Sequence, residues 1–213
     1  MTEHSSVAAL VLAGGSSRRM HADKRTLSLD DKSFLNRAIA TARSVTDDVW
    51  LLVSSHGEYR RLEGELVESV NVAVDRIPNA GPMSALAGVL PHLRTELTLL
   101  LAVDYPLLTP AFLHGLIARY ESQDPRPSVI VPQSRGKWHV TCALYATSLG
   151  PSLVREVDRG ERSLWRWTSS LPEAEIKVID EATWREWAAH DVLTNVNTPA
   201  EYCRLHRRYF RAD

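Results

Sequence analysis

The most chemically suggestive stretch of the sequence is LAGGSSRRMHADKR, residues 12–25, which follows an apolar run near the start of the chain. Gly14 and Gly15 have no Cβ, so backbone N–H groups in this segment can approach an anion closely. Four cationic side chains follow within eight residues: Arg18, Arg19, Lys24 and Arg25. A polyphosphate is the ligand that this local density of positive charge favours.

This segment differs from the familiar phosphate loops. A Walker A motif needs Gly-Lys-Ser/Thr, whereas Lys24 stands between Asp23 and Arg25. The dinucleotide fingerprint G-x-G-x-x-G is absent, because the first glycine after Gly15 is Gly57. These differences weaken the kinase, GTPase and dehydrogenase interpretations. A solvated basic turn is the alternative to a ligand site, and the position directly after a buried strand favours the ligand site.

A carboxylate follows the most apolar run of the chain. Asp104 comes directly after residues 97–103, LTLLLAV, and Pro106 then turns the chain away. If this strand is parallel to the first one, Asp104 lies at the same edge of the sheet as the glycine-rich loop. Because a phosphate-bound Mg²⁺ usually takes one or two protein carboxylates, Asp104 is the expected metal ligand. A helix-capping or turn aspartate is the alternative.

A second carboxylate, Asp75, ends the expected strand at residues 70–74. Gly81 and Pro82 then mark a tight entry into a helix. The spacing by itself favours an Asp75 side chain that is satisfied by backbone N–H groups of its own loop. A place in a ligand site at the same sheet edge is the alternative.

The elements that must position these residues alternate between strand and helix. Strands are expected at residues 7–12, 48–54, 70–74, 97–103, 128–132, 139–146 and 175–179. Helices are expected at residues 34–42, 58–65, 82–93, 110–122 and 199–210. This order predicts an α/β fold with three layers, a Rossmann-like, mostly parallel sheet with helices on both faces. We expect one domain, 1–213, with a nucleotide-binding part over about 7–110 and an acceptor-binding part over about 128–200.

The composition is that of a soluble globular protein, with 213 residues, a hydrophobic share of 44% and a net charge of -1. This charge gives no general reason to bind nucleic acid or an anionic membrane. Cys142 and Cys203 lack the spacing of a metal site or a disulfide framework. The apolar run at residues 7–13 is too short for a membrane span and has no basic segment before it. A cytoplasmic location is therefore expected.

Together the segments resemble the MobA-type molybdenum cofactor guanylyltransferases, within the nucleotidyltransferases of α/β fold. LAGGSSRRMHADK matches the family pattern L-A-G-G-x-S-x-R-M-G-x-D-K, and NVNTPAEY matches N-x-N-T-P-x-E. Weaker matches are GPMSALAGVL after Asp75, VDYPLLTP, HVTCALY and GERSLW. The matches span residues 10–202. The sequence departs from the pattern at His21, where the family usually has glycine, at Ser54 and Ser55, and at Val140.

The resemblance implies a set of site residues. Those at the nucleotide are Leu12, Ala13, Gly14, Gly15, Arg18, Lys24, Ser54, Asp75, Gly81, Pro82 and Asp104. Arg18 and Lys24 would contact the phosphates, and Asp104 would hold Mg²⁺, or Mn²⁺ in its place, so these three are the expected catalytic residues. Those at the acceptor are His139, Asn195 and Asn197.

The implied reaction transfers GMP from GTP to the terminal phosphate of molybdopterin, with or without its metal, and releases pyrophosphate. Alternatives are CTP as donor, or a sugar or polyol phosphate as acceptor, and a non-catalytic nucleotide- or cofactor-binding chaperone. LAGG favours the guanylyl branch, because cytidylyl relatives tend to read L-A-A-G, and NVNTP favours a pterin. The implied partners are GTP and the molybdopterin-type acceptor, with molybdoenzymes or cofactor-synthesis proteins as further candidates and neither nucleic acid nor membrane among them.

Overall fold

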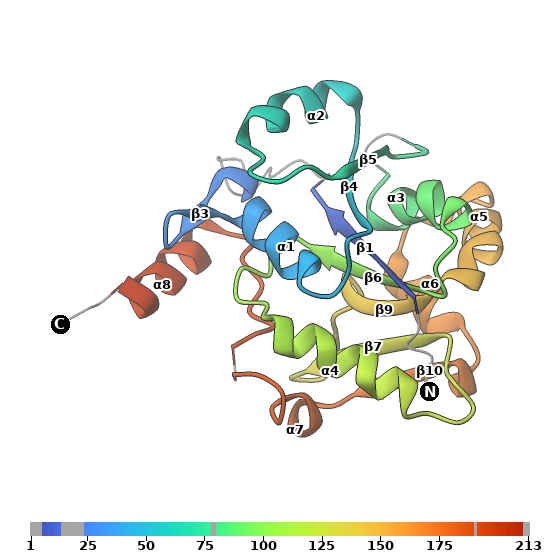
Figure 1. Ribbon diagram of the computed structural model, residues 1–213. Helices are drawn as coiled ribbons and strands as arrows, with labels where there is room; N and C mark the ends of the chain where they lie inside the picture. Colours follow the sequence, from blue (N-terminus) through green and yellow to red (C-terminus); the bar gives the residue numbers. More distant parts are fainter. Residues whose placement is uncertain (1–5, 14–23, 78–79, 190, 211–213) are drawn as a thin grey trace.

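A single twisted sheet runs through the protein in the computed structural model, which describes residues 6–13, 24–77, 80–189 and 191–210 (Figure 1). In spatial order its strands are β10 (Ile176–Ile179), β7 (Val129–Ser134), β9 (Cys142–Ala146), β6 (Leu97–Ala102), β1 (Val7–Leu12), β4 (Val49–Val53) and β5 (Asn71–Val74), and β8 (Lys137–Trp138) pairs with β7. Pairing is parallel at β10–β7, β6–β1, β1–β4 and β4–β5. It is antiparallel where β9 meets β6 and β7 and in the β7–β8 hairpin. The expectation of a mostly parallel sheet is confirmed.

Helices cover both faces of this sheet, as the apolar runs of the strands require. One face packs against α1 (Phe34–Arg43), α4 (Pro110–Glu121) and α7 (Glu181–Trp184), and the other against α3 (Pro82–Val89), α5 (Gly150–Asp158) and α6 (Leu164–Ser170). Successive residues of β1 alternate between the two cores: Ala9 and Val11 face the first, and Leu10 and Leu12 the second. The three-layer architecture is thereby confirmed.

The C-terminal helix and several short elements complete the chain. They are η1 (Lys24–Thr26), the hairpin of β2 (Ser28–Leu29) and β3 (Lys32–Ser33), α2 (His56–Leu62), η2 (Glu63–Glu65), η3 (Leu90–His92), η4 (Thr147–Leu149), η5 (Glu173–Glu175) and α8 (Pro199–Phe210). The helix expected at residues 82–93 ends early, at Val89. Pro91 explains the break, because proline has no N–H to donate to the carbonyl one helical turn earlier.

The register of the strands sets the level of the residues that follow them. Leu12 pairs with Ala102 of β6 and with Leu52 of β4, and Leu52 pairs with Ala73 of β5. Asp104, Ser54 and Asp75 each come two residues after one of these partners. All three therefore leave the sheet at one level, at the carboxyl ends of parallel strands, where ligands bind in such folds.

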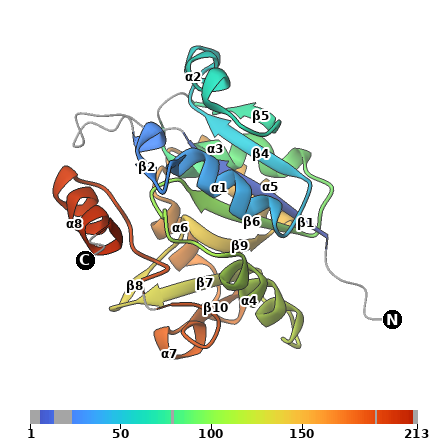
Figure 2. The ribbon, with the colours of Figure 1, turned by 60° about the vertical axis from the view of Figure 1, so that its left-hand side comes forward.

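Helix α8 lies beyond these carboxyl ends, beside the β2–β3 hairpin (Figures 1 and 2). A third, small core holds it there, formed by Leu29, Phe34, Val196 and Leu205. The Tyr202 ring packs edge-on against Phe34, and its hydroxyl donates to the carbonyl of Ser28 at 2.9 Å. The C-terminal helix is thus attached to the N-terminal part of the chain.

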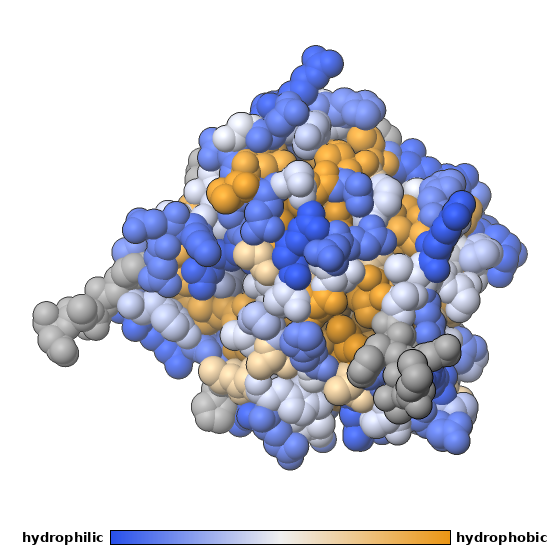
Figure 3. All heavy atoms as spheres, in the orientation of Figure 1, coloured by the Kyte–Doolittle hydropathy of each residue, from blue (hydrophilic) through white to orange (hydrophobic). Residues whose placement is uncertain are grey.

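Polar residues cover much of the surface on the face drawn in Figure 3, and apolar residues show between them. Helix α1 illustrates the reason, since its buried positions recur at helical spacing and leave the remaining positions to solvent. Among the residues that the structure describes, no helix is both long and apolar enough to cross a membrane.

Candidate active site

The two ends of the glycine-rich segment are held together by Arg25. Ala13 is buried, and its N–H donates to the Leu52 carbonyl at 3.0 Å. The Arg25 guanidinium donates to the Ala13 carbonyl at 3.2 Å. The segment expected to bind phosphates thus departs from the end of β1, next to β4, and the chain returns at η1 to the same place. Gly14, Gly15, Arg18 and the Lys24 side chain lie outside the described residues.

Glu58 binds the residues at this place, where η1 lies next to the ends of β1 and β4. It forms an ion pair with Arg25 in which both side chains are only 11% exposed. Its other carboxylate oxygen accepts hydrogen bonds from the Ser54 N–H at 2.5 Å and the Ser54 hydroxyl at 2.7 Å. The sequence groups Arg25 with the phosphate-binding cations, but the structure pairs its charge with Glu58. Ser54, the expected nucleotide contact, likewise has its N–H and hydroxyl engaged by Glu58.

Sequence reasoning missed Glu58, although a signal for it exists. Ser55 and Glu58 have the S-x-x-E spacing of a helix N-terminus, and the Ser55 hydroxyl accepts from the Glu58 N–H at 3.1 Å. The Glu58 side chain then bonds to Ser54 rather than to the capping residue itself. The spacing predicts the helix start, but not the arginine that lies far away in sequence.

Asp75 follows β5 at the same edge. Its N–H donates to the Val53 carbonyl at 2.9 Å, while no group in the described part of the chain donates a hydrogen bond to its Oδ1, which is buried. Burial, and secondarily the charge of Glu58, raises the pKa of the Asp75 carboxyl to about 6. A buried carboxylate oxygen with no protein donor is one that a ligand can supply with a partner.

Gly81 and Pro82 form the entry into α3. Gly81 has φ +87°, a conformation that glycine adopts at low cost, and Pro82 occupies the first turn of the helix. The fully buried Ser84 closes the loop, because its hydroxyl accepts from the Ile77 N–H at 3.0 Å and donates to the Ile77 carbonyl at 3.2 Å. Ile77, two residues after Asp75, is therefore joined to the first turn of α3.

Asp104 is joined to the two asparagines of the C-terminal motif. The Val196 N–H donates to the Asp104 carbonyl at 2.8 Å, and the Val196 side chain is fully buried. Asn195 and Asn197 flank this anchor, and their amides are hydrogen-bonded to each other. The expected metal ligand and two expected acceptor contacts therefore come together from segments far apart in the sequence.

The rest of the NVNTPAEY motif starts a helix. The Thr198 hydroxyl accepts from the Glu201 N–H at 3.3 Å, and the Glu201 carboxylate accepts from the N–H groups of Thr198 at 2.9 Å and Asn197 at 2.7 Å. With Pro199 in the first turn, this is a capping box that begins α8. The threonine, proline and glutamate thus fix the loop on which the asparagines sit.

His139 lies behind this site. Its side chain is almost fully buried, and both ring nitrogens are engaged, Nδ1 with the Tyr105 hydroxyl at 3.1 Å and Nε2 with the Ser134 hydroxyl at 2.7 Å. Burial, with a smaller contribution from Lys137, lowers the pKa of His139 to about 4. The ring is therefore neutral at pH 7 and connects the loop after β6 to β7. A direct contact with an acceptor stays a prediction.

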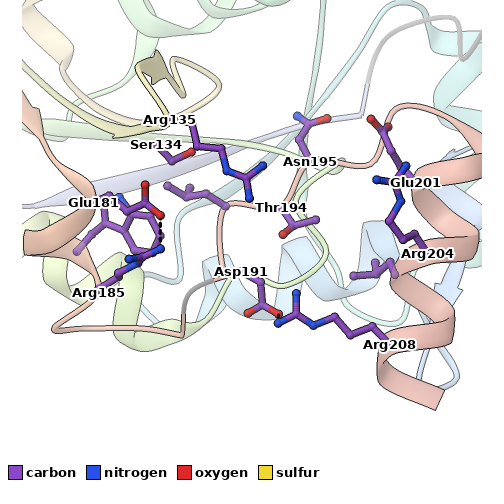
Figure 4. Close-up of a pocket in the computed structure, with 13 residues that line it drawn as sticks. Ser134, Arg135, Glu181, Arg185, Asp191, Thr194, Asn195, Glu201, Arg204 and Arg208 are labelled. Carbon is purple, nitrogen blue, oxygen red and sulfur yellow. Dashed lines mark hydrogen bonds and ion pairs between the residues drawn. The ribbon is translucent and has the colours of Figure 1, made fainter. Parts of the chain in front are cut away.

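An open cavity of about 460 Å³ adjoins Asn195 (Figure 4). The β7–β8 hairpin, α7, the segment before Asn195 and α8 form its walls. Ser134, which holds His139, is part of the same wall. Sequence reasoning did not anticipate this cavity, because its walls come from four separate segments.

The carboxylates at this edge fit a metal that is carried by a nucleotide. Among the described residues, no three histidine, cysteine, aspartate or glutamate side chains converge on one point. A nucleotide-bound Mg²⁺ does not need such a cluster, because phosphates and waters supply most of its ligands. Asp104 and Asp75 follow strands that are three spacings apart, roughly 14 Å, so the two carboxylates are not placed to share one metal ion.

Comparisons with known proteins show the family of this chain. The sequence profile of the MobA-like NTP transferase domain matches residues 9–175. A protein of Synechococcus elongatus named probable molybdenum cofactor guanylyltransferase is 30% identical over 198 residues, which is 93% of this chain and 97% of the relative.

Solved structures have the same fold. The molybdopterin-guanine dinucleotide biosynthesis protein A of Archaeoglobus fulgidus superposes with a TM-score of 0.77 at 19% identity, covering 92% of this chain and 95% of the other. A Mycobacterium tuberculosis protein solved in complex with manganese gives a TM-score of 0.64 at 20% identity, covering 94% and 97%. From the profile match and the relative together, we conclude that this chain belongs to the MobA-like NTP transferase family of nucleotidyltransferases.

Proposed function

We propose that the protein transfers GMP from GTP to the terminal phosphate of a molybdopterin-type acceptor and releases pyrophosphate. The observation that carries the proposal is the hydrogen bond between the Val196 N–H and the Asp104 carbonyl, 2.8 Å. It ties the loop with the candidate acceptor contacts to the strand end beside β1, where the glycine-rich segment begins. Donor and acceptor would thus meet at Asp104. The relative's name supports molybdopterin as the acceptor.

The donor side would be divided along the sheet edge. The backbone of Gly14 and Gly15, together with Arg18 and Lys24, would bind the phosphates beyond the end of β1. Leu12, Ala13 and Ser54 would form the floor of the nucleotide site, and Asp75, Gly81 and Pro82 its far wall. Asp104 would hold Mg²⁺, or Mn²⁺, whose charge would neutralise the phosphates when it is bound.

The transfer is a substitution at phosphorus. An oxygen of the acceptor's terminal phosphate attacks the α-phosphorus of GTP, a new phosphorus–oxygen bond forms, and the bond to the bridging oxygen of the β-phosphate breaks. Pyrophosphate carries away the electron pair of that bond. Because the attacking phosphate is already ionised at pH 7, no protein base has to remove a proton. The chain's contribution is to position the two phosphates and to stabilise their charge.

The acceptor side would be formed by the C-terminal half. Asn195 and Asn197 provide amide donors and acceptors next to Asp104, and His139 supports them through Tyr105 and Ser134. We propose that residues of about 7–110 bind the nucleotide and those of about 128–200 bind the acceptor, within one domain.

A pyrophosphate-release assay tests the proposal. The protein is incubated with Mg²⁺, a molybdopterin-type acceptor and GTP, CTP, ATP or UTP in separate reactions, with a sugar phosphate replacing the acceptor in a parallel set. Release with GTP and molybdopterin only is the expected result. Release with CTP would move the protein to the cytidylyl branch. GTP binding without release under any condition would favour the non-catalytic alternative.

A further inference from the structure

The cavity beside Asn195 holds charge that the transfer step does not use. Its wall contains four arginines, Arg135, Arg185, Arg204 and Arg208. Arg185 forms an ion pair with Glu181, and Arg208 forms one with Asp191 at 3.5 Å. Neither Arg135 nor Arg204 forms an ion pair or side-chain hydrogen bond with any residue that the structure describes. Two guanidinium groups in one cavity are therefore left to bind something else.

The remaining carboxylate among the described residues of the wall, Glu201, has another task. It accepts hydrogen bonds from the N–H groups of Asn197 and Thr198 at the start of α8. Arg204 follows one helical turn later without forming an ion pair with it. The charge of Glu201 is thus directed to the helix start, and the cavity keeps a positive surface.

The backbone conformation at Arg135 also supports a ligand-binding role. Arg135 has φ +50° and Gly136 has φ +75°, and together they make the two-residue turn between β7 and β8. Such turns favour asparagine, aspartate and glycine, whereas a long side chain is disfavoured in the left-handed region. The exposed Arg135 side chain forms no hydrogen bond or ion pair with the described residues that would offset this choice. A locally unfavourable residue without structural compensation is a pointer to function.

The two arginines approach the cavity from different elements. In Figure 4, Arg135 extends into it from the hairpin and Arg204 faces it from α8, with Thr194 and Asn195 between them. A guanidinium can donate two parallel hydrogen bonds to an oxyanion, so this pair suits one anionic group.

We propose that Arg135 and Arg204 bind a second anionic group of the acceptor, at the end remote from the phosphate that attacks GTP. The inference rests on the proposed function. Strand β7, which carries the Arg135 turn, lies two strand spacings, roughly 10 Å, from β6, which leads to Asp104. An anion bound beside this turn would lie to one side of a phosphate at Asp104, and Asn195 adjoins both the cavity and the Val196–Asp104 contact. The acceptor class is a phosphate ester with a further negative charge on its far side.

Steady-state kinetics with GTP and the molybdopterin-type acceptor test this proposal. In the Arg135→Gln/Arg204→Gln variant, we expect the KM for the acceptor to rise on the order of tenfold to a hundredfold, because two charge-assisted hydrogen bonds are lost. The KM for GTP and kcat should change less than about twofold by the same reasoning. Arg94→Gln is the matched control, since it removes one exposed arginine near the start of β6, at the opposite sheet edge. An unchanged KM for the acceptor in the double variant would overturn the inference while leaving the proposed function standing.

A second measurement does not depend on turnover. Inorganic phosphate is titrated into the protein saturated with GTP, and the guanidinium NMR signals of Arg135 and Arg204, assigned with the single variants, are followed. Both signals should shift saturably, and that of Arg94 should not. Absence of a shift at both arginines would contradict the inference, even if the transfer reaction itself could not be detected with any nucleotide.

The Arg135→Asn variant separates function from folding. Asparagine tolerates the left-handed conformation better than arginine, so the melting temperature should equal or exceed that of the wild type. The KM for the acceptor should nevertheless rise as in Arg135→Gln. A lower melting temperature with an unchanged KM would assign Arg135 a structural role and refute the inference.

Discussion

The two halves of the sheet position their polar residues by different means. On the β1–β4–β5 side, parallel strands in register bring Ser54 and Asp75 to the level at which the glycine-rich segment departs. On the β9–β7–β10 side, antiparallel pairing intervenes, and Asn195 is placed by one backbone contact between Val196 and Asp104. The first half follows from strand order, and the second depends on a long-range contact.

The halves also differ in how their charges are balanced. Near the end of β4, Arg25, Glu58 and Ser54 satisfy one another in a network that is largely shielded from water. In the cavity next to α8, Arg135 and Arg204 have no such protein partners among the described residues. A satisfied network holds a backbone segment in place, whereas guanidinium groups without a protein partner keep their donors available to a ligand. We therefore propose a positioning role for the first group and a binding role for the second.

The largest expected effect is at the junction of the halves. Asp104→Asn removes the charge of the candidate metal ligand, so turnover should fall on the order of a thousandfold. Pyrophosphate release measures the loss, and circular dichroism checks that the fold is kept. Near-normal turnover would show that the metal binds elsewhere and that Asp104 has no role in the mechanism.

Loss of a phosphate-binding cation should follow. Lys24→Ala is expected to lower kcat/KM for GTP by roughly two to four orders of magnitude, because one electrostatic donor to the phosphates is lost. Arg94→Gln again controls for overall charge. If the variant reacts at the wild-type rate, Lys24 does not act on the phosphates and the donor half has to be reassigned.

Because we assign Glu58 a positioning role, we expect its substitution to change the free energy of unfolding more than the rate of the reaction. Glu58→Gln leaves Arg25 without its counter-charge in a shielded site, so the free energy of unfolding should fall by about 1–3 kcal/mol. Urea denaturation measures this change, with the exposed Glu65→Gln as the control on the neighbouring turn. The double variant with Arg25→Gln should cost less than the sum of the single variants. Simple additivity would show that the pair does not act as a unit.

The smallest effect concerns pH. The pKa of Asp75 is about 6 in the folded protein and about 3.9 in an unfolded chain, so the folded state holds more protons between these values. The contribution of Asp75 to stability is therefore favourable below about pH 4 and is lost as the pH rises through 6. Asp75→Asn should remove this slope and raise the stability at pH 7 by about 1 kcal/mol, after allowance for solvent screening. Unfolding curves from pH 4 to 7 measure both, and identical slopes in variant and wild type would argue against a raised pKa.

Much of this protein follows from its sequence, because the determining interactions are local. The apolar runs before Asp104 and Asp75 predict a buried central strand and a half-buried edge strand, and parallel order then brings both carboxylates to one edge. The T-P-x-E spacing at residues 198–201 specifies a helix start through hydrogen bonds within one turn. Pro91 likewise ends a helix through its own covalent geometry.

Tertiary structure determined the remaining features, namely the partners of buried charges, the contact between Val196 and Asp104, and the cavity. These features join segments that are distant along the chain. Nothing near Arg25 in sequence reveals that Glu58 neutralises it, and nothing near Asn195 reveals that its neighbour Val196 binds the Asp104 backbone. The cavity of Arg135 and Arg204 exists only because the fold brings a hairpin and the C-terminal helix to the same place. Local sequence determines whether each segment forms a helix, a strand or a turn. The partner of a charged side chain is determined by tertiary packing, and it cannot be read from the pattern of residues along the chain.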